Sequence, residues 1–219
     1  AEKKTIAVKP SRVYALSPSG FEGVKPKAVV KEGDSVKAGD ALFVNKDYPE
    51  VKFASPVSGK VVLVERGDRR KLLSIRVEAD NEQEYADFGV KSVDSLTGAQ
   101  VKTALLEAGL FGYINQLPYA VSTNPSAEPK AIFVSALRDM PLAGDFSYEL
   151  QGQEQDFQTG LTALSKMAKT YLGVGKNQKI SAEDVETVIF SGKCPAGNVG
   201  VQVNHISPVN KGEVVWTVD

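Results

Sequence analysis

The sequence has very few residues of the kinds that bind metals and clusters. It contains one cysteine, Cys194, and one histidine, His205. A single cysteine excludes an internal disulfide and an iron–sulfur cluster held by this chain alone, and it suits a reducing cytoplasm. A single histidine excludes a metal site built from several histidines of this chain. We therefore expect no metal, a structural role for Cys194, and a packed or solvent-facing His205.

Strong net charge and long apolar runs are also missing. The formal net charge is -1 over 219 residues, which gives no electrostatic reason to expect nucleic acid or an anionic membrane surface as a partner. No apolar run approaches the roughly 20 residues of a transmembrane helix. The chain starts at Ala1 without a signal-peptide pattern, so we expect a fragment of a longer protein with no transmembrane segment.

Two glycine-marked half-motifs, residues 30–43 and 53–61, predict a biotinyl/lipoyl-like barrel-sandwich domain over residues 1–80. In the first, Gly33 and Gly39 suit turns with positive φ, and Val36, Leu42 and Val44 should point inward. Carriers of this fold hold a modified lysine on the hairpin between the halves, here residues 45–50. That hairpin has no Met-Lys-Met or Asp-Lys-Ala tip, and its Lys46 lies close to the preceding strand. We expect no covalently bound cofactor.

A second hairpin is predicted within the same domain. Residues 61–64 alternate against residues 73–77 in the way of half-buried strands, with a turn at residues 66–68. The densest basic run of the chain lies at this turn and consists of Arg66, Arg69, Arg70 and Lys71. It can be a solvated hairpin or a docking patch for an acidic partner.

Residues 81–129 are expected to form a helical and irregular linker. Thr97 can cap a helix whose apolar positions are 101, 104, 105 and 108, and Gly109 and Gly112 should end it. The proline-containing stretch 117–129 is the predicted boundary.

Residues 130–219 show a βαβ pattern. Strands are predicted at 131–136, 171–175, 185–191 and 214–218. A long loop, 137–155, precedes a helix that Asp156 should cap, and a helical turn is expected at 181–184. Alternating elements of this kind predict an α/β domain with a Rossmann-like parallel sheet.

The glycine-rich segments do not match the phosphate-binding patterns. A Walker loop would need a glycine in place of Thr170, and the first βα turn, after Ala136, has no glycine cluster. We interpret Gly173 and Gly175 as turn glycines, and we expect weak or no binding of NADH and FMN.

The ordered set of segments resembles a known family, the A subunits of the sodium-translocating NADH:quinone oxidoreductase, Na+-NQR. The resemblance covers nearly the whole chain and rests on residues 30–39, 45–47, 51–59, 64–71, 130–136, 156–161 and 195–200, with His205 close behind. It implies a peripheral protein at the cytoplasmic face of the cell inner membrane, with the other Na+-NQR subunits as partners. It also implies an accessory role associated with quinone, because the flavins, the iron–sulfur centre and the NADH site belong to other subunits of that complex.

Quinone is therefore the expected small ligand, as a substrate of the complex. In open parallel sheets ligands lie beyond the carboxyl ends of the strands, where loops 135–142 and 192–200 should face each other. The expected quinone-binding residues are Ser135, Leu137, Arg138, Met140, Leu142, Gly197 and Gly200. Their apolar walls, few donors and close backbone approach suit a headgroup with two carbonyl oxygens. In the alternative interpretation the first loop is a rigid connector and Arg138 pairs with Asp139.

Two other functions stay open at this point. An electron-transfer protein of the RnfC type, from the Rnf complex, has a similar layout, but it carries cluster-binding cysteines, and this sequence has only Cys194. A biotin- or lipoate-modified carrier component would depend on Lys46.

Overall fold

The computed structural model describes residues 4–89 and 92–219. It contains two compact units, one made of Ala1–Val90 and Thr103–Tyr113, the other of Lys91–Lys102 and Ile114–Asp219. The segment 81–129, which we expected to be a linker, thus supplies residues to both units.

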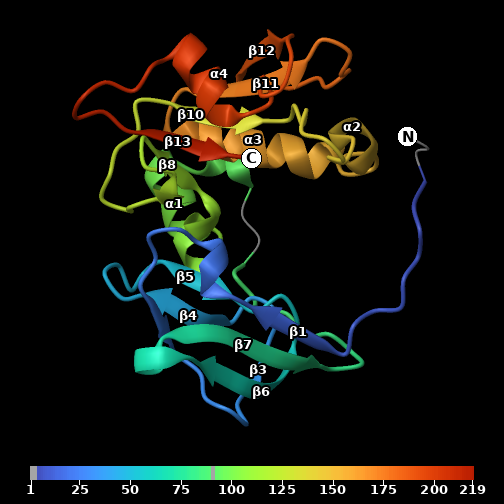
Figure 1. The fold of residues 1–219 in the computed structure, drawn as a ribbon, viewed down its shortest axis with the longest axis vertical. Coiled ribbons are helices and arrows are strands. Elements are labelled where there is room, and N and C mark those ends of the chain that lie inside the picture. Colours follow the sequence, from blue (N-terminus) through green and yellow to red (C-terminus); the bar gives the residue numbers. More distant parts are fainter. Residues whose placement is uncertain (1–3, 90–91) are drawn as a thin grey trace. The chain divides into compact units, whose positions relative to one another are not determined.

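The first unit contains two small antiparallel sheets (Figure 1). One has the strand order β1-β7-β6-β3 and the other the order β2-β4-β5. The strands are β1 (Val13–Leu16), β2 (Pro26–Ala28), β3 (Ser35–Val36), β4 (Ala41–Asn45), β5 (Lys52–Ala54), β6 (Gly59–Arg66) and β7 (Leu72–Ala79). Short 3-10 turns, η1 (Pro18–Gly20) and η2 (Asp68–Arg70), follow β1 and β6. The β6–β7 pairing confirms the hairpin predicted at 61–77.

The side chains predicted to point inward do so. Val36, Leu42 and Val44 are all buried, and Gly33 and Gly39 have the positive φ angles expected of their turns, 94° and 103°. Leu42, Phe43, Phe53, Val61 and Ile75 are almost fully buried. Removing these side chains from water supplies the main favourable free energy of this unit.

Helix α1 (Gly98–Glu107) confirms the predicted helix, its start after Thr97 and its end before Gly109, whereas Gly112 belongs to the 3-10 turn that follows. Thr97 Oγ1 accepts from the Gln100 amide, and Gln100 Oε1 accepts from the Thr97 amide, which is a capping box. At the other end Gly109 has a φ of 71°, and the Leu110 amide donates to the Leu105 carbonyl as in a Schellman motif. The 3-10 turn η4 (Phe111–Tyr113) follows directly.

The second unit contains one six-stranded sheet with the order β12-β11-β10-β13-β8-β9. Strands β10 (Ile132–Ser135), β11 (Thr170–Gly175), β12 (Glu186–Phe190) and β13 (Val215–Val218) run parallel, as predicted. Strands β8 (Asn115–Leu117) and β9 (Val121–Ser122) add an antiparallel edge that we had expected to be irregular linker. The 3-10 turn η3 (Val93–Ser95) also belongs to this unit.

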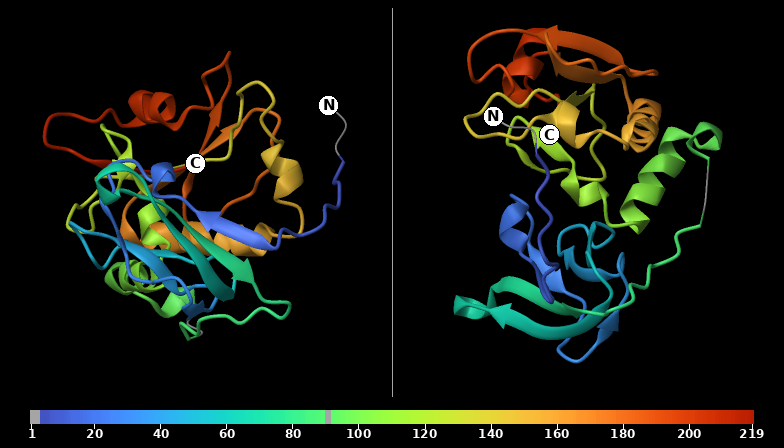
Figure 2. Two further views of the ribbon diagram at one scale, coloured as in Figure 1. Left: turned by 60° about the horizontal axis from the view of Figure 1, so that its bottom comes forward. Right: turned by 90° about the vertical axis from the view of Figure 1, so that its right-hand side faces the viewer.

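Helices cover both faces of this sheet. Val199 and Val203 of α4 (Val199–Ile206) pack with Phe133 on one face, while Leu161 of α3 (Glu154–Met167) packs with Val134 on the other. The opposite orientation of Phe133 and Val134 follows from the two-residue period of a strand. Figure 2 shows these helices with the strands between them.

Three local predictions in this unit were wrong. Helix α3 begins at Glu154 after the N-cap Gln153, so Asp156 lies inside the first turn, where its charge favours the helix dipole. Residues 181–184 form no helical turn, because side chains of α3 hold them instead: the Glu183 amide donates to Gln158 Oε1, and Thr162 Oγ1 donates to Asp184 Oδ2. The loop 137–155 contains a short helix, α2 (Phe146–Glu149), that Asp145 caps.

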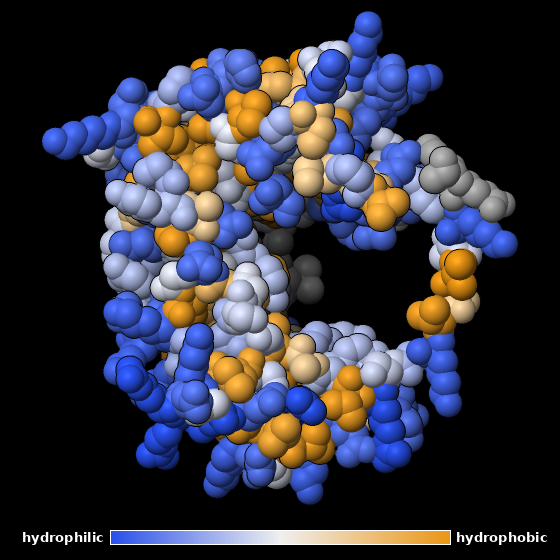
Figure 3. All heavy atoms as spheres, viewed as in Figure 1, coloured by the Kyte–Doolittle hydropathy of each residue, from blue (hydrophilic) through white to orange (hydrophobic). Residues whose placement is uncertain are grey.

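Hydrophilic side chains cover most of the face drawn in Figure 3, and the hydrophobic residues on it form small separate groups. Across residues 4–89 and 92–219, no helix is both long and apolar enough to cross a membrane.

Candidate functional site

The two loops at the carboxyl ends of β10 and β12 face each other, as predicted. Ser135 Oγ lies 3.2 Å from the carbonyl oxygen of Gly197, to which it donates a hydrogen bond. Further along the same loops, Cys194 Sγ lies 3.5 Å from Met140 Sδ. The loops are thus joined near the strand ends and touch again at the Cys194–Met140 contact.

A buried glutamine from helix α4 fixes this junction. Gln202 is only 1% exposed, and its Nε2 donates to Ser135 Oγ at 3.0 Å and to the Ala196 carbonyl at 3.3 Å. A Cβ on Gly173 would lie 2.1 Å from Gln202 Oε1, so β11 must have a glycine at this point. Our interpretation of Gly173 as a turn glycine was therefore wrong, since it lies inside a strand and makes room for the amide.

Gln202 and helix α4 were not predicted from the sequence. Asn198 is the N-cap of this helix, and its side chain accepts from the amides of Gly200 and Val201. An asparagine two residues before a glycine and a run rich in valine is a weak signal, because valine and glycine both have low helix propensity. Gly200 is consequently a first-turn residue of a helix, and its amide is already used by the cap.

Arg138 has a different partner from the one that the alternative interpretation gave it. Its Nη1 lies 2.6 Å from Glu149 Oε2, and its guanidinium lies over the Phe146 ring at 5.3 Å from the centroid. The alternative interpretation, in which Arg138 pairs with Asp139, is therefore wrong. Because the pair with Glu149 is about half exposed, it contributes little stability and can open to admit another acceptor.

Asp139 and Gly197 are fitted to each other. A Cβ on Gly197 would lie 2.6 Å from Asp139 Oδ1 and 2.7 Å from the Leu137 carbonyl oxygen. Both carboxyl oxygens of Asp139 are buried, and among the described residues neither has a hydrogen-bond partner. The missing side chain of Gly197 thus makes room for a neighbouring loop of the same chain.

The three apolar residues of the first loop form a gradient of exposure. Leu137 is half-buried, and its Cδ1 would lie 2.9 Å from a Cβ on Gly175. Met140 is 61% exposed, while Leu142 is fully exposed and has a φ of 65°. The outer part of the loop therefore presents an apolar rim to solvent, and the inner part packs against β11.

The other candidate residues lie outside this junction. Lys46 is exposed directly after β4, where its amide donates to the Lys25 carbonyl, and Lys25 Nζ pairs with Asp47 Oδ2 at 2.9 Å. His205 is exposed in the last turn of α4. In the part of the chain that the structure describes, no group of three or more His, Cys, Asp and Glu side chains could hold a metal ion.

Both units match families of known proteins. Residues 1–80 match the NqrA N-terminal barrel-sandwich hybrid domain, and residues 96–219 match the NqrA second alpha/beta domain. Among curated proteins, the chain is 32% identical over its whole length to the A subunit of the Na(+)-translocating NADH-quinone reductase of Pseudomonas aeruginosa strain UCBPP-PA14, covering 50% of that protein. It is 35% identical to the corresponding protein of Neisseria meningitidis serogroup A over 94% of the chain and 47% of the relative. For that of Yersinia pseudotuberculosis serotype O:1b, the identity is 34% over 93% of the chain and 47% of the relative. The chain spans about half the length of these relatives.

Proposed function

Because the chain belongs to the NqrA family, we propose that it works as part of the NqrA protein of a membrane-bound, Na+-pumping NADH:quinone oxidoreductase. In this role it is peripheral, lies at the cytoplasmic face of the inner membrane and contacts other subunits of the complex. Its contribution is assembly and association with quinone, and it carries out no NADH or flavin chemistry of its own.

One observation carries this proposal: the chain matches both family domains, and in the second of them the loops at the carboxyl ends of β10 and β12 are bonded to each other. At the carboxyl end of β10, the Ser135–Gly197 contact and the buried Gln202 amide bring the loops together. The first βα turn, after Ala136, has no glycine cluster that would let its backbone approach a pyrophosphate. In the first domain, Lys46 lies beside the strand and not at a hairpin tip.

The quinone contact that we propose is the outer part of the same loops. The parallel order β12-β11-β10-β13 supports a Rossmann-like domain with its crevice at these strand ends. Met140 and Leu142 provide exposed apolar surface, and the Arg138 guanidinium provides a donor for a carbonyl oxygen if its half-exposed pair with Glu149 opens. Ser135, Leu137, Gly197 and Gly200 support the loops from within.

The quinone contact is tested in full-length NqrA within the assembled complex. Arg138→Ala and Leu142→Asp should each raise the apparent KM for quinone about threefold or more in NADH-driven quinone reduction, because a donor or an apolar contact is lost. Arg12→Ala is the matched control, since Arg12 also forms an exposed ion pair, with Glu78, but lies in the first domain. If both variants assemble and keep the quinone KM of the unmodified complex, the loops serve only as scaffold.

The assembly role is tested separately. Tagged full-length NqrA should co-purify from membranes with untagged neighbours, which mass spectrometry identifies. Recovery of the tagged protein by itself, under conditions in which the complex stays intact, would contradict this role.

A further inference from the structure

The turn between β6 and β7 holds a basic loop in a costly backbone conformation. Arg69 and Arg70 both have positive φ angles, 53° and 61°. Two successive non-glycine residues in this region cost about 1–2 kcal/mol each. The loop is held by backbone hydrogen bonds from Gly67 to Lys71 and from Arg70 to Gly67, and Arg66 Nη1 donates to the Arg70 carbonyl.

This conformation leaves cations in solvent without acidic partners. Arg69, Arg70 and Lys71 are exposed, and among the described residues no salt bridge includes any of them. Elsewhere in the same unit Arg12 pairs with Glu78, and Arg76 pairs with Glu65. Together with Arg66 these residues give the turn four cations against one carboxylate, that of the exposed Asp68, so the end of the hairpin is a net positive patch whose field favours an anionic partner.

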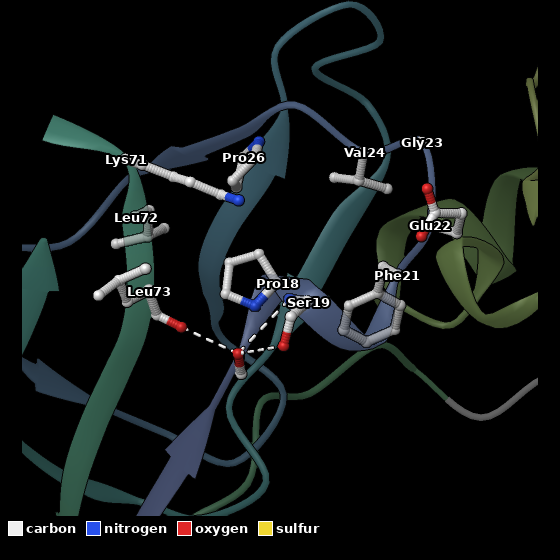
Figure 4. A pocket seen from close by; sticks show the side chains of 11 residues that line it. Pro18, Ser19, Phe21, Glu22, Gly23, Val24, Pro26, Lys71, Leu72 and Leu73 are labelled. Carbon is white, nitrogen blue, oxygen red and sulfur yellow. Dashed lines mark hydrogen bonds between the residues drawn. The ribbon is translucent and has the colours of Figure 1, made fainter. Parts of the chain in front are cut away.

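A cavity of about 400 Å³ adjoins the turn and shares Lys71 with it (Figure 4). The cavity has a mixed lining: Leu72 and Leu73 of β7 and the apolar residues Pro18, Phe21, Val24 and Pro26 share it with Ser17, Ser19, Lys71 and the acidic Glu22. Leu73 is 41% exposed and also covers the turn, since a Cβ on Gly67 would lie 3.0 Å from its Cδ1.

Internal hydrogen bonds set the shape of this cavity. Ser17 Oγ donates to the Leu73 carbonyl at 2.9 Å and lies 2.9 Å from Ser19 Oγ. These bonds tie the segment after β1 to β7, on the two sides of the cavity. Lys71 extends over it in the direction of Pro26 (Figure 4). Because these bonds already order the walls of the cavity, ligand binding costs little conformational entropy of the residues that line it.

We propose that the turn and the cavity together bind an acidic segment of a partner polypeptide that carries one apolar side chain. Its carboxylates pair with Arg69 and Arg70, and its apolar side chain enters the cavity against Leu73. Charge complementarity to the turn identifies the acidic segment, and the hollow beside the charges, which has both apolar and polar lining, favours a polypeptide over a flat anionic bilayer. The inference adds a docking surface to the proposed assembly role, but its test uses the chain alone, so the two can fail independently.

The test is an NMR titration of the ¹⁵N-labelled 219-residue chain with two capped peptides, Asp-Glu-Leu-Glu-Asp and Asp-Glu-Gly-Glu-Asp. We expect the leucine peptide to bind at least fivefold more tightly and to shift the amide signals of residues 17–26 and 66–73. Both affinities should fall as salt is added, since the pairs are exposed. Equal affinity of the two peptides, or shifts outside these residues, would overturn the proposal.

Variants separate the charge from the fold. Arg69→Gly/Arg70→Gly removes two cations while suiting the positive φ angles, so the fold should remain and peptide affinity should fall about tenfold or more. The control Lys9→Glu/Lys60→Glu alters charge near the opposite end of the β6–β7 hairpin and should retain at least half of the affinity. Leu73→Ala should abolish the preference for the leucine peptide over the glycine peptide.

The last arm of the test uses vesicles of phosphatidylglycerol and phosphatidylcholine. If the unmodified chain binds these vesicles but neither peptide, and the Arg69→Gly/Arg70→Gly variant does not bind the vesicles, the partner is a lipid surface and the proposal is overturned.

Discussion

Gly112 lies directly against the ring of Phe53, so that a Cβ on the glycine would be 2.6 Å from Phe53 Cε1. Phe53 in turn stacks on Phe43, with ring centroids 4.6 Å apart, and lies 4.3 Å from the ring of Phe21. The loop after α1 therefore completes the aromatic core of the first unit, and it can do so only with no side chain at position 112.

Gly112→Ala is expected to lower the free energy of unfolding by about 1–3 kcal/mol, because an added methyl group must displace a buried ring. Denaturant unfolding followed by far-UV circular dichroism measures the change. Gly20→Ala is the matched control, since a Cβ at Gly20 meets nothing within 4 Å. An equal loss in both variants would show that the Phe53 contact is not the cause.

Gly160→Ala should raise stability. Gly160 is exposed within helix α3, and a Cβ there meets nothing within 4 Å. Alanine is favoured over glycine in a helix interior by about 0.5–1 kcal/mol, because it loses less backbone entropy on folding. The same denaturant measurement should show a shift of the transition to higher denaturant. A shift of the transition to lower denaturant concentration would contradict the helical conformation of residue 160.

Glu65 should contribute to the acid sensitivity of the chain. The hydroxyl of Ser74 donates to its carboxylate, and together with Arg76 this holds the pKa of Glu65 below its ordinary value of 4.5. Because the folded pKa is the lower one, the stabilisation is present above the unfolded pKa and is lost as pH falls through the folded pKa. Glu65→Gln should therefore be less stable than the unmodified chain at neutral pH, and this difference should shrink in acid. Thermal unfolding of both chains, from neutral pH to below the ordinary glutamate pKa of 4.5, measures this difference in stability, with Glu82→Gln as control. A difference that does not change with pH would show that the charge of Glu65 is not its cause.

Lys46 should be unmodified, because it lies off the hairpin tip and lacks the flanking residues that a ligase reads. Intact mass of protein made with biotin and lipoate supplied should equal that of the 23.5 kDa chain. A mass increment located on Lys46 would instead support a carrier function.

The purified chain should be colourless and should bind NADH and FMN weakly or not at all, because the first βα turn has no glycine-rich approach to a pyrophosphate. Absorbance after gel filtration and calorimetry are sufficient measurements. A retained flavin spectrum or low-micromolar NADH binding would refute the expectation.

Sequence reasoning succeeded where structure is local. The β6–β7 hairpin, the helix cap at Thr97 and the glycine end at Gly109 each depend on residues a few positions apart, and all three were predicted, although the reciprocal bond from Gln100 was not. The candidate site was harder because its partners are distant in sequence. Nothing near Arg138 indicates that Glu149 is its partner, and nothing near Ser135 indicates Gln202.

The edge strands of the second sheet show the same limit. β8 is three residues long and precedes a proline-containing stretch, so its propensity is weak, and it becomes a strand because Val215 and Trp216 pair with Leu117 and Gln116. The preference of such a segment is decided by tertiary pairing and not by its own residues.

The position of β13 between β10 and β8 has a consequence for synthesis on the ribosome. Ile132 must pair with Trp216, so the central strand of the second sheet emerges long after its two neighbours. Until then both neighbours have an unpaired edge, which is a template for association with other chains. The first unit has its longest pairing in the local hairpin β6–β7, which closes quickly. We therefore expect nascent chains that stall before residue 215 to contain a folded barrel-sandwich and an aggregation-prone second domain.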